Sequence, residues 1–285
     1  MTAAEHAQFH PHSSDVARDL ARRGTILLVQ VGSGVHGTAI DGQDDRDEMG
    51  LCLEPREFVT GVATVPGRAG DEPSRIPFEQ YEYHSAWERM GGLANRSGAG
   101  DLDVIIYSAR KWVRLAVQGN ATVLLPLFVP EHEVVAIADA GRELRENTRR
   151  IASRRAADRF LGYMSGQRRA MTGDSGAHTN RPELVAEFGY DCKFAMHALR
   201  LGVQGVEYLT TGRITLPIPE PELTALREVR RGEWDLARVL AWSDDLEQQL
   251  VGLREKSPLP ADPDVEWIND WLHRSYLAYW KTGCV

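Results

Sequence analysis

VQVGSGVHG, residues 29–37, begins with the last three residues of the apolar run TILLVQV (residues 25–31) and contains the spacing G-x-G-x-x-G. Two kinds of fold use such a turn. In a dinucleotide-binding fold the turn opens directly into a helix whose N-terminus holds a pyrophosphate, and an acidic residue follows about twenty positions later. In a nucleotidyltransferase a Gly-Ser turn after the first strand presents backbone N–H groups to a triphosphate, and paired carboxylates follow on the next strand. The residues after the turn decide between the two folds.

The segment after the turn, TAIDGQDDRDEMG (residues 38–50), cannot be written as an amphipathic helix. It contains a glycine, five acidic residues and only three clearly apolar side chains. Glu54 satisfies the acidic position of a dinucleotide site, but the helix that such a site needs is missing before it. The first predicted element is also a helix rather than a strand. The sequence therefore favours the nucleotidyltransferase interpretation.

Three aspartates follow the turn in the order that a two-metal site needs. Asp45 and Asp47 are separated by one residue, so on a strand both point to one face. DLDVIIYS, a predicted strand, supplies the third carboxylate from Asp103, with Asp101 on the same face as the alternative. Taken singly, an acidic loop or a glycine turn is commonplace, but their order and spacing together indicate a site.

This site has a defined chemistry. Carboxylate oxygens are the ligands that Mg²⁺ or Mn²⁺ prefers. Two such ions would activate the attacking oxygen and neutralise charge on the leaving pyrophosphate. Asp103 is also placed to accept the proton of the acceptor hydroxyl. The predicted catalytic and metal-binding residues are Asp45, Asp47 and Asp103, and the predicted triphosphate turn is Gly32 and Ser33.

Hydrophobic periodicity predicts an α+β N-terminal part and a helical remainder. The predicted domains are an α+β domain at residues 1–130 and an all-helical domain at residues 131–285. The predicted N-terminal elements are a helix over 13–24, strands over 25–31, 49–55 and 101–108, a loop over 67–77 and a helix over 108–120. The predicted later helices cover residues 136–164, 182–202, 220–231, 234–254 and 264–280, with a polar, irregular stretch at 167–180.

Four blocks of the chain resemble a known family. They are VGSGVHGTAIDGQDDRDEMGLCLEP, DLDVIIYSARKWVRLAVQGNATVLLPLFVP, RFLGYMSGQ and YDCKFAMHALRLGVQGVEYLTTGRITLP. In this order they resemble the RNA-ligase-associated predicted nucleotidyltransferases of the DNA polymerase beta superfamily, which bacteria and bacteriophages carry. The resemblance implies a DNA polymerase beta-like mixed sheet with helices, followed by an all-helical domain that closes the nucleotide cleft. It also implies an enzyme that uses a nucleoside triphosphate and Mg²⁺ and modifies RNA, with tRNA ends among the acceptors. The turn departs from the family pattern, since Gly34 and His36 stand where a basic and an aromatic residue are common.

The helical domain supplies further candidates for nucleotide binding. Lys193, His197 and Arg200 fall at i, i+4 and i+7, on one helical face. This basic stripe, together with the resemblance, assigns Lys193 and Arg200 to the triphosphate. Tyr163 and Gln167 lie one helical turn apart and are candidates for contacts with base or ribose, although core packing and a surface amide fit them almost equally well.

The net charge and its distribution along the chain indicate which partners the protein binds. The net charge of −8 argues against nonspecific coating of nucleic acid. However, nine arginines and three acidic residues lie between Arg142 and Arg169. The seven arginines from Arg142 to Arg159 fall in one predicted helix, either as a basic ridge for an RNA acceptor or as a solvated face. Nucleotidylation of a protein and a catalytically quiet, NTP-binding regulator remain alternative functions.

Other features predict a cytoplasmic protein without a membrane segment. The chain has no run of eighteen apolar residues and no signal-peptide pattern. Its three cysteines lack metal-ligand spacing and predict reduced thiols. Tryptophans recur at helical intervals near the C-terminus, which suits core packing or a homodimer contact.

Overall fold

The computed structural model describes residues 10–40, 44–69, 72–90, 97–172 and 181–282. The chain divides into two units, each made of segments that are discontinuous in sequence. The first unit contains Met1–Arg114, Val129–Asn147 and Val265–Val285, and the second contains Leu115–Phe128 and Thr148–Asp264. In the part of the chain that is described, no helix has both the length and the apolar character needed to cross a bilayer.

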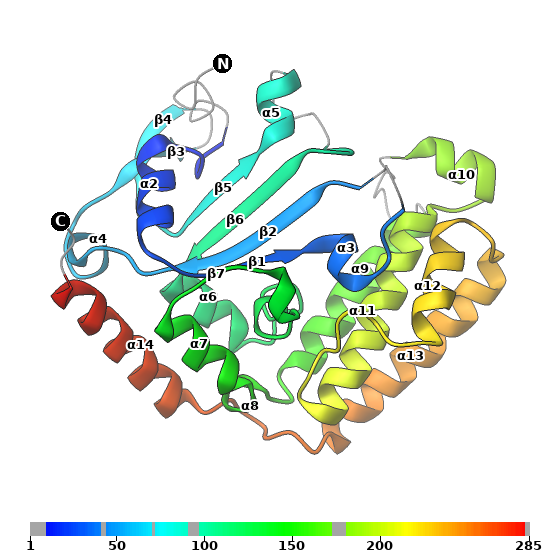
Figure 1. Cartoon of the computed structure of the whole chain (residues 1–285). Coiled ribbons are helices and arrows are strands. Elements are labelled where there is room, and N and C mark those ends of the chain that lie inside the picture. The colour runs from blue at the N-terminus through cyan, green and yellow to red at the C-terminus, as the bar shows by residue number, and fades with distance from the viewer. Residues whose placement is uncertain (1–9, 41–43, 70–71, 91–96, 173–180, 283–285) are drawn as a thin grey trace. The chain divides into compact units, whose positions relative to one another are not determined.

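A five-stranded mixed sheet forms the centre of the first unit, in the order β5-β6-β2-β1-β7 (Figure 1). β2 and β6 run parallel, and the other neighbours are antiparallel. The strands are β1 (Thr25–Val31), β2 (Arg46–Cys52), β5 (Gln80–His84), β6 (Leu102–Ser108) and β7 (Val134–Ile137). β1 and β6 confirm the predicted first and third strands, while β2 begins three residues before the strand predicted at 49–55.

The first helix, α2 (Asp15–Arg23), forms as its end signals predict. Ser14 Oγ accepts a hydrogen bond from Ala17 N at 3.3 Å, which caps the N-terminus. Gly24 ends the helix. The apolar face of α2 packs on the sheet, where Ala17 and Ala21 are buried together with residues of β2, β5 and β6.

Further helices of the first unit are α3 (Gly32–His36), α4 (Arg56–Val59), α5 (Ser85–Met90), α6 (Ala109–Ala116, shared with the second unit), α7 (Asp139–Glu146) and α14 (Val265–Lys281). α7 lies so close to β1 that a Cβ on Gly141 would stand 2.2 Å from the Ile26 carbonyl oxygen. The indole of Trp271 on α14 donates to the Ala140 carbonyl oxygen. The C-terminal helix therefore packs with the sheet unit, and not with the helical remainder as the boundary at residue 130 predicts.

The second unit is helical. Its helices are α8 (Thr148–Ile151), α9 (Ala156–Thr172), α10 (Pro182–Phe188), α11 (Cys192–Thr211), α12 (Glu222–Arg230) and α13 (Leu236–Lys256). Two short 3₁₀ turns, η1 (Leu125–Leu127) and η2 (Glu131–Glu133), complete the elements, the second of them in the first unit. The helices predicted at 220–231 and 234–254 are confirmed, whereas the one predicted at 182–202 is divided at Gly189, which has a φ of +80°.

Two predicted segments are wrong because strand pairing, rather than the local sequence pattern, decides their conformation. Residues 67–77, predicted as a loop, lie largely in the antiparallel hairpin of β3 (Val65–Ala69) and β4 (Glu72–Ile76). The helix predicted over 136–164 is divided into β7, α7, α8 and the start of α9. The polar stretch predicted at 167–180 begins inside α9, and residues 173–180 lie outside the described residues.

A buried ionic network ties the C-terminal helix to the end of β2. Glu54 is fully buried and accepts hydrogen bonds from the Tyr276 hydroxyl and, at 2.9 Å, from Arg110 Nη2. The indole of Trp280 donates to the Glu54 carbonyl oxygen. Burial raises the pKa of Glu54, and the bonds from Tyr276 and Arg110 oppose that shift.

Replacing Tyr276 with phenylalanine is expected to destabilise the protein by about 1–3 kcal/mol, because a buried carboxylate loses one of its donors. Chemical denaturation monitored by circular dichroism measures this change. Leu277→Ala, on the exposed side of the same helix, is the control and should stay within about 0.5 kcal/mol of wild type. Equal midpoints for Tyr276→Phe and wild type would show that the network does not stabilise the fold.

Candidate active site

One row of residues crosses four strands of the sheet. Val31 on β1 pairs with Asp47 on β2, and Asp47 pairs with Asp103 on β6. Asp103 in turn pairs with His84 on β5. Because paired residues on neighbouring strands point to the same face, the side chains of this row lie side by side.

The three predicted aspartates converge at this row. Asp45, Asp47 and Asp103 are each half-buried, and each offers a carboxylate oxygen within 4.8 Å of the other two. Three negative charges this close repel one another unless a cation lies between them. Oxygen donors alone form the set, which fits Mg²⁺ or Mn²⁺ and does not fit a metal that prefers sulfur or imidazole.

Asp101, the alternative third ligand, has a structural role. Its carboxylate accepts hydrogen bonds from Ser85 Oγ at 2.9 Å and from Gly98 N at 2.9 Å. It is 5% exposed, and its carbonyl oxygen accepts from Arg46 N, the first residue of β2. Asp101 therefore orders the chain before β6, while Asp103 joins the carboxylate cluster.

The Gly-Ser turn lies against Asp47. Gly32 has a φ of +80°, which favours glycine, and a Cβ there would stand 2.0 Å from Asp47 Oδ2. Ser33 follows in α3, and its carbonyl oxygen accepts from Thr38 N. The turn and the metal-binding carboxylates predicted from sequence are thus neighbours in space.

Asp103 is held by two residues that the sequence analysis did not identify. Ser97 Oγ donates to Asp103 Oδ1 at 2.6 Å, and His84 Nδ1 lies 2.8 Å from Asp103 Oδ2. On its other ring nitrogen, His84 contacts Glu82 at 3.3 Å. Burial alone would lower the pKa of His84, but the bonds to Asp103 and Glu82 outweigh burial and raise it to about 9. A protonated imidazole beside Asp103 therefore offsets part of the negative charge of the cluster.

His84 was missed because β5 was not predicted, and the pairing of β5 with β6 brings it to Asp103. Its ring also packs on Trp87, with centroids 4.4 Å apart. His10, from the N-terminal segment, packs on the same indole and lies 3.5 Å from Glu82. His84 could be located only from the pairing of the strands, and His10 only from the packing of its segment on Trp87.

The nucleotide-binding candidates Lys193 and Arg200 lie on α11 of the second unit. Arg200 Nη1 donates to the buried Gln204 at 3.0 Å, and burial lowers the pKa of Arg200 to about 10. Asp191 caps α11 by accepting from the backbone N–H groups of Lys193 and Phe194.

Positive charge gathers around His197 on the same helix. Burial, and then Arg200, Lys193, Arg230 and Arg181, in decreasing order of effect, lower the pKa of His197 well below its usual value. Arg181 and Arg230 extend the basic stripe predicted from Lys193 and Arg200. They come from outside α11, so helical spacing could not reveal them.

Tyr163 and Gln167 share one face of α9. The Tyr163 side chain is exposed, and its hydroxyl accepts a hydrogen bond from Asn120 Nδ2 at 2.8 Å. Gln167 is half-buried. Both belong to the second unit, as Lys193 and Arg200 do.

The basic ridge predicted from Arg142 to Arg159 does not form as one helix. α7 ends at Glu146, and residues 152–155 are not helical because Arg154 N donates to the Pro260 carbonyl oxygen. The side chains of five of the seven arginines bind protein groups, namely Arg145 to Val129 and Glu131, Arg150 to Asp264, Arg154 to Glu255, Arg155 to Asp262 and Arg159 to Gln118. These five side chains therefore have partners within the protein, and the single helical ridge predicted from the sequence is absent.

The free energy of unfolding should fall as the pH drops below about 6.5, because His197 takes up a proton in the unfolded chain but resists it in the folded one. One such group contributes up to about 1.4 kcal/mol per pH unit. Denaturant unfolding of wild type and His197→Gln between pH 8 and 5 measures this, and the two curves should converge at low pH. His273→Gln removes an exposed histidine, and its free energy of unfolding should follow that of wild type at every pH, with at most a constant offset. The same parallel behaviour in His197→Gln would show that His197 does not cause the pH dependence.

A mixed sheet with three carboxylates beside a Gly-Ser turn is typical of nucleotidyltransferases. The model of the RNA repair pathway DNA polymerase beta family matches residues 4–274, and the chain belongs to this family. The chain is thus a nucleotidyltransferase of the DNA polymerase beta superfamily, with the α+β fold predicted from its sequence.

Curated proteins and solved structures provide two further comparisons. No curated protein matches the chain significantly. Among solved structures, a nucleotidyltransferase-like protein from Exiguobacterium sibiricum aligns with 93% of this chain and 75% of its own, at 12% identity and a TM-score of 0.27.

Proposed function

We propose that the protein transfers a nucleoside monophosphate from an NTP to the end of an RNA, with Mg²⁺ bound by Asp45, Asp47 and Asp103. The main support for this proposal is that the three carboxylates lie together beside the Gly-Ser turn. Membership of a family named for RNA repair supports RNA as the acceptor.

The residues of the site have distinct roles in this reaction. Bound Mg²⁺ supplies Lewis-acid stabilisation of the α-phosphate and the pyrophosphate. Gly32 and Ser33 present backbone N–H groups to the triphosphate. Asp103 accepts the proton of the RNA hydroxyl as that oxygen bonds to the α-phosphorus, and the bond from the α-phosphorus to the pyrophosphate oxygen breaks. Ser97 and His84 hold the Asp103 carboxylate for this role.

Within the second unit, we propose that Lys193 and Arg200 bind phosphates of the NTP and that Tyr163 and Gln167 contact its base or ribose. The positive field at His197 supports the assignment of Lys193 and Arg200, because grouped cations suit a polyanion. Lys193→Ala should raise KM for the NTP more than it lowers kcat.

Incubation with each α-labelled NTP tests the function as a whole. Each reaction contains Mg²⁺ and one acceptor, either RNA with a free 3′-hydroxyl, the same RNA with a 3′-phosphate, or a protein lysate. The expected result is label on the RNA with a free hydroxyl, pyrophosphate release in equal amount, and loss of both with a chelator. Label on protein alone would favour protein nucleotidylation, and NTP binding without pyrophosphate release would favour a regulator.

A further inference from the structure

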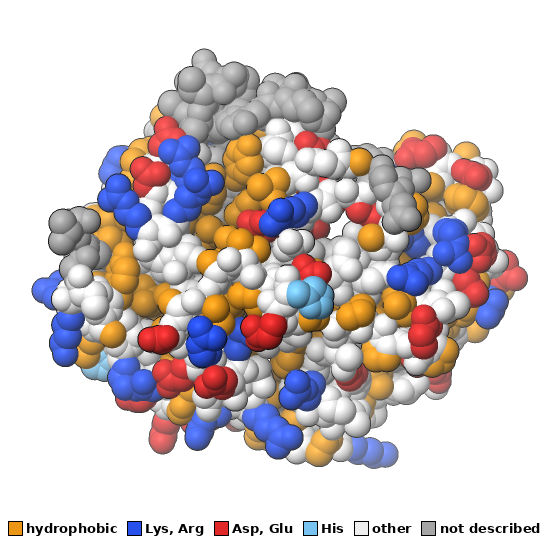
Figure 2. All heavy atoms as spheres, in the orientation of Figure 1, with side chains coloured by type: hydrophobic (Ala, Val, Ile, Leu, Met, Phe, Trp, Pro, Cys, Tyr) orange, Lys and Arg blue, Asp and Glu red, His pale blue; other side chains and the backbone are white. Residues whose placement is uncertain are grey.

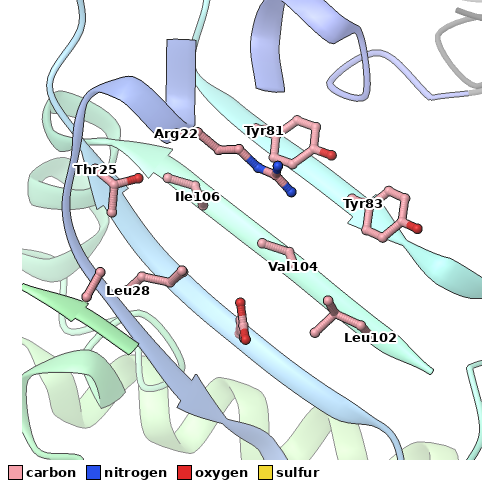
Figure 3. A pocket seen from close by; sticks show the side chains of 10 residues that line it. Arg22, Thr25, Leu28, Tyr81, Tyr83, Leu102, Val104 and Ile106 are labelled. Atoms are coloured by element: carbon pink, nitrogen blue, oxygen red, sulfur yellow. The ribbon is translucent and has the colours of Figure 1, made fainter. Parts of the chain in front are cut away.

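A cavity lies on the face of the sheet opposite the carboxylate row. Successive strand residues point to opposite faces, so Glu48, Val104 and Tyr83 point away from the face of Asp47 and Asp103. The cavity measures about 240 Å³ (Figure 3). Its lining residues are Arg22, Thr25, Leu28, Glu48, Tyr81, Tyr83, Leu102, Val104, Ile106 and Ala136.

The floor and one wall of the cavity are apolar and aromatic. Leu28 on β1 and Val104 and Ile106 on β6 form part of the floor, on the two sides of β2. Tyr81 and Tyr83 stand side by side on β5 (Figure 3). In Figure 2, hydrophobic side chains gather over this part of the sheet, with charged side chains among them. Aromatic rings beside an apolar floor suit a flat, unsaturated ligand.

Two charged side chains give the cavity polarity. The Arg22 side chain reaches over it from the last turn of α2 (Figure 3). Arg22 is exposed and has no ion-pair partner within the described parts of the chain, whereas Arg18 on the same helix pairs with Asp15. The Glu48 side chain, 10% exposed, accepts from Arg46 through Oε1 at 2.7 Å. The cavity therefore combines an exposed cation with a buried hydrogen-bond acceptor.

We propose that this cavity binds one unpaired nucleotide of an RNA strand. The base lies on Tyr83 and the apolar floor, its amino group donates to Glu48, and a backbone phosphate pairs with Arg22. Cytosine, adenine and guanine carry such an amino group and uracil does not, so the site prefers these bases to uracil. The choice of RNA as ligand rests on the proposed function, but the cavity is separate from the catalytic row.

Fluorescence anisotropy with labelled oligo(C) and oligo(U), in chelator and without NTP, tests the cavity apart from catalysis. Wild type should bind oligo(C) more tightly than oligo(U). Tyr83→Ala should weaken oligo(C) binding by between about five-fold and about a hundred-fold, and Tyr83→Phe should retain it. Arg22→Ala should weaken binding of both oligonucleotides and reduce the salt slope by about 0.7.

Arg23→Ala is the matched control, since Arg23 is exposed on the same turn but does not line the cavity. Circular dichroism and melting temperature establish that each variant is folded. Unchanged binding and base preference in folded Tyr83→Ala and Arg22→Ala would overturn the proposal, as would the absence of any RNA binding. Loss of a dimer in these variants would also overturn it and assign the surface to a second copy. If RNA binding follows the expected pattern but no nucleotide is transferred, the proposed function is wrong and the proposal for the cavity is supported.

Discussion

Replacing Asp47 with asparagine is expected to lower nucleotidyl transfer by about a hundred- to a thousand-fold. Asp47 offers a carboxylate oxygen within 4.8 Å of those of Asp45 and Asp103. Its loss should remove several kcal/mol of metal-dependent stabilisation of the transition state, at about 1.36 kcal/mol for each factor of ten. The folded protein should be no less stable without metal, because one of three repelling charges is removed. Initial rates with labelled NTP, together with melting curves in chelator, measure both effects.

Metal binding provides a readout of Asp47 that does not depend on turnover. The melting temperature of wild type should rise with Mg²⁺ or Mn²⁺, and that of Asp47→Asn should not, because a ligand that binds only the folded state stabilises it. Asp44→Asn is the matched control: it removes a charge near the cluster and keeps an oxygen that can accept from Ile40 N. Wild-type activity in Asp47→Asn, or an equal loss in Asp44→Asn, would show that the metal site has been assigned wrongly.

Replacing Gly32 with alanine is expected to destabilise the protein by about 1–3 kcal/mol and to remove most of its activity. The φ of +80° disfavours any side chain, and the added Cβ would stand 2.0 Å from Asp47 Oδ2. The turn or the Asp47 carboxylate must then move, and a displacement of about 1 Å at a reacting site can cost about a hundred-fold in rate. Denaturant unfolding and initial rates measure the two losses.

Gly34, two residues later in the same turn, offers the control. It is exposed, and an added Cβ would meet no atom within 4 Å. Gly34→Ala should therefore retain wild-type stability and activity. If both alanine variants behave alike, the close approach of Gly32 to Asp47 does not matter for the site.

The carboxylate cluster could be predicted because it depends on local patterns. Alternation along a strand places Asp45 and Asp47 on one face, whichever strand lies beside them. The choice of Asp103 over Asp101 required the structure, since only hydrogen bonds to Ser85 and Gly98 show that Asp101 orders a loop.

The errors share a physical cause. The second half of β7 was predicted as helix because a four-residue strand at the edge of a sheet has a weak sequence pattern, and its pairing with β1 decides its conformation. Gly67 and Pro73 led to the prediction of a loop, because Gly and Pro are rare inside strands, but the pairing of β3 with β4 makes this segment a hairpin. The arginines beyond Arg142 follow a helical spacing, but a hydrogen bond from Arg154 N to a distant carbonyl oxygen interrupts the helix.

The Gly-Ser turn, the order of the carboxylates, the first helix and the family could all be recognised in the amino-acid sequence. Each of these is encoded by neighbouring residues, whose side-chain directions and capping preferences follow from the local backbone. Three features emerge only from tertiary packing: His84 and Ser97 at Asp103, the packing of α14 against Glu54, and the cavity on the opposite face of β2 and β6. These contacts join segments far apart in the chain, and strand pairing and packing select them through interactions that no local pattern specifies.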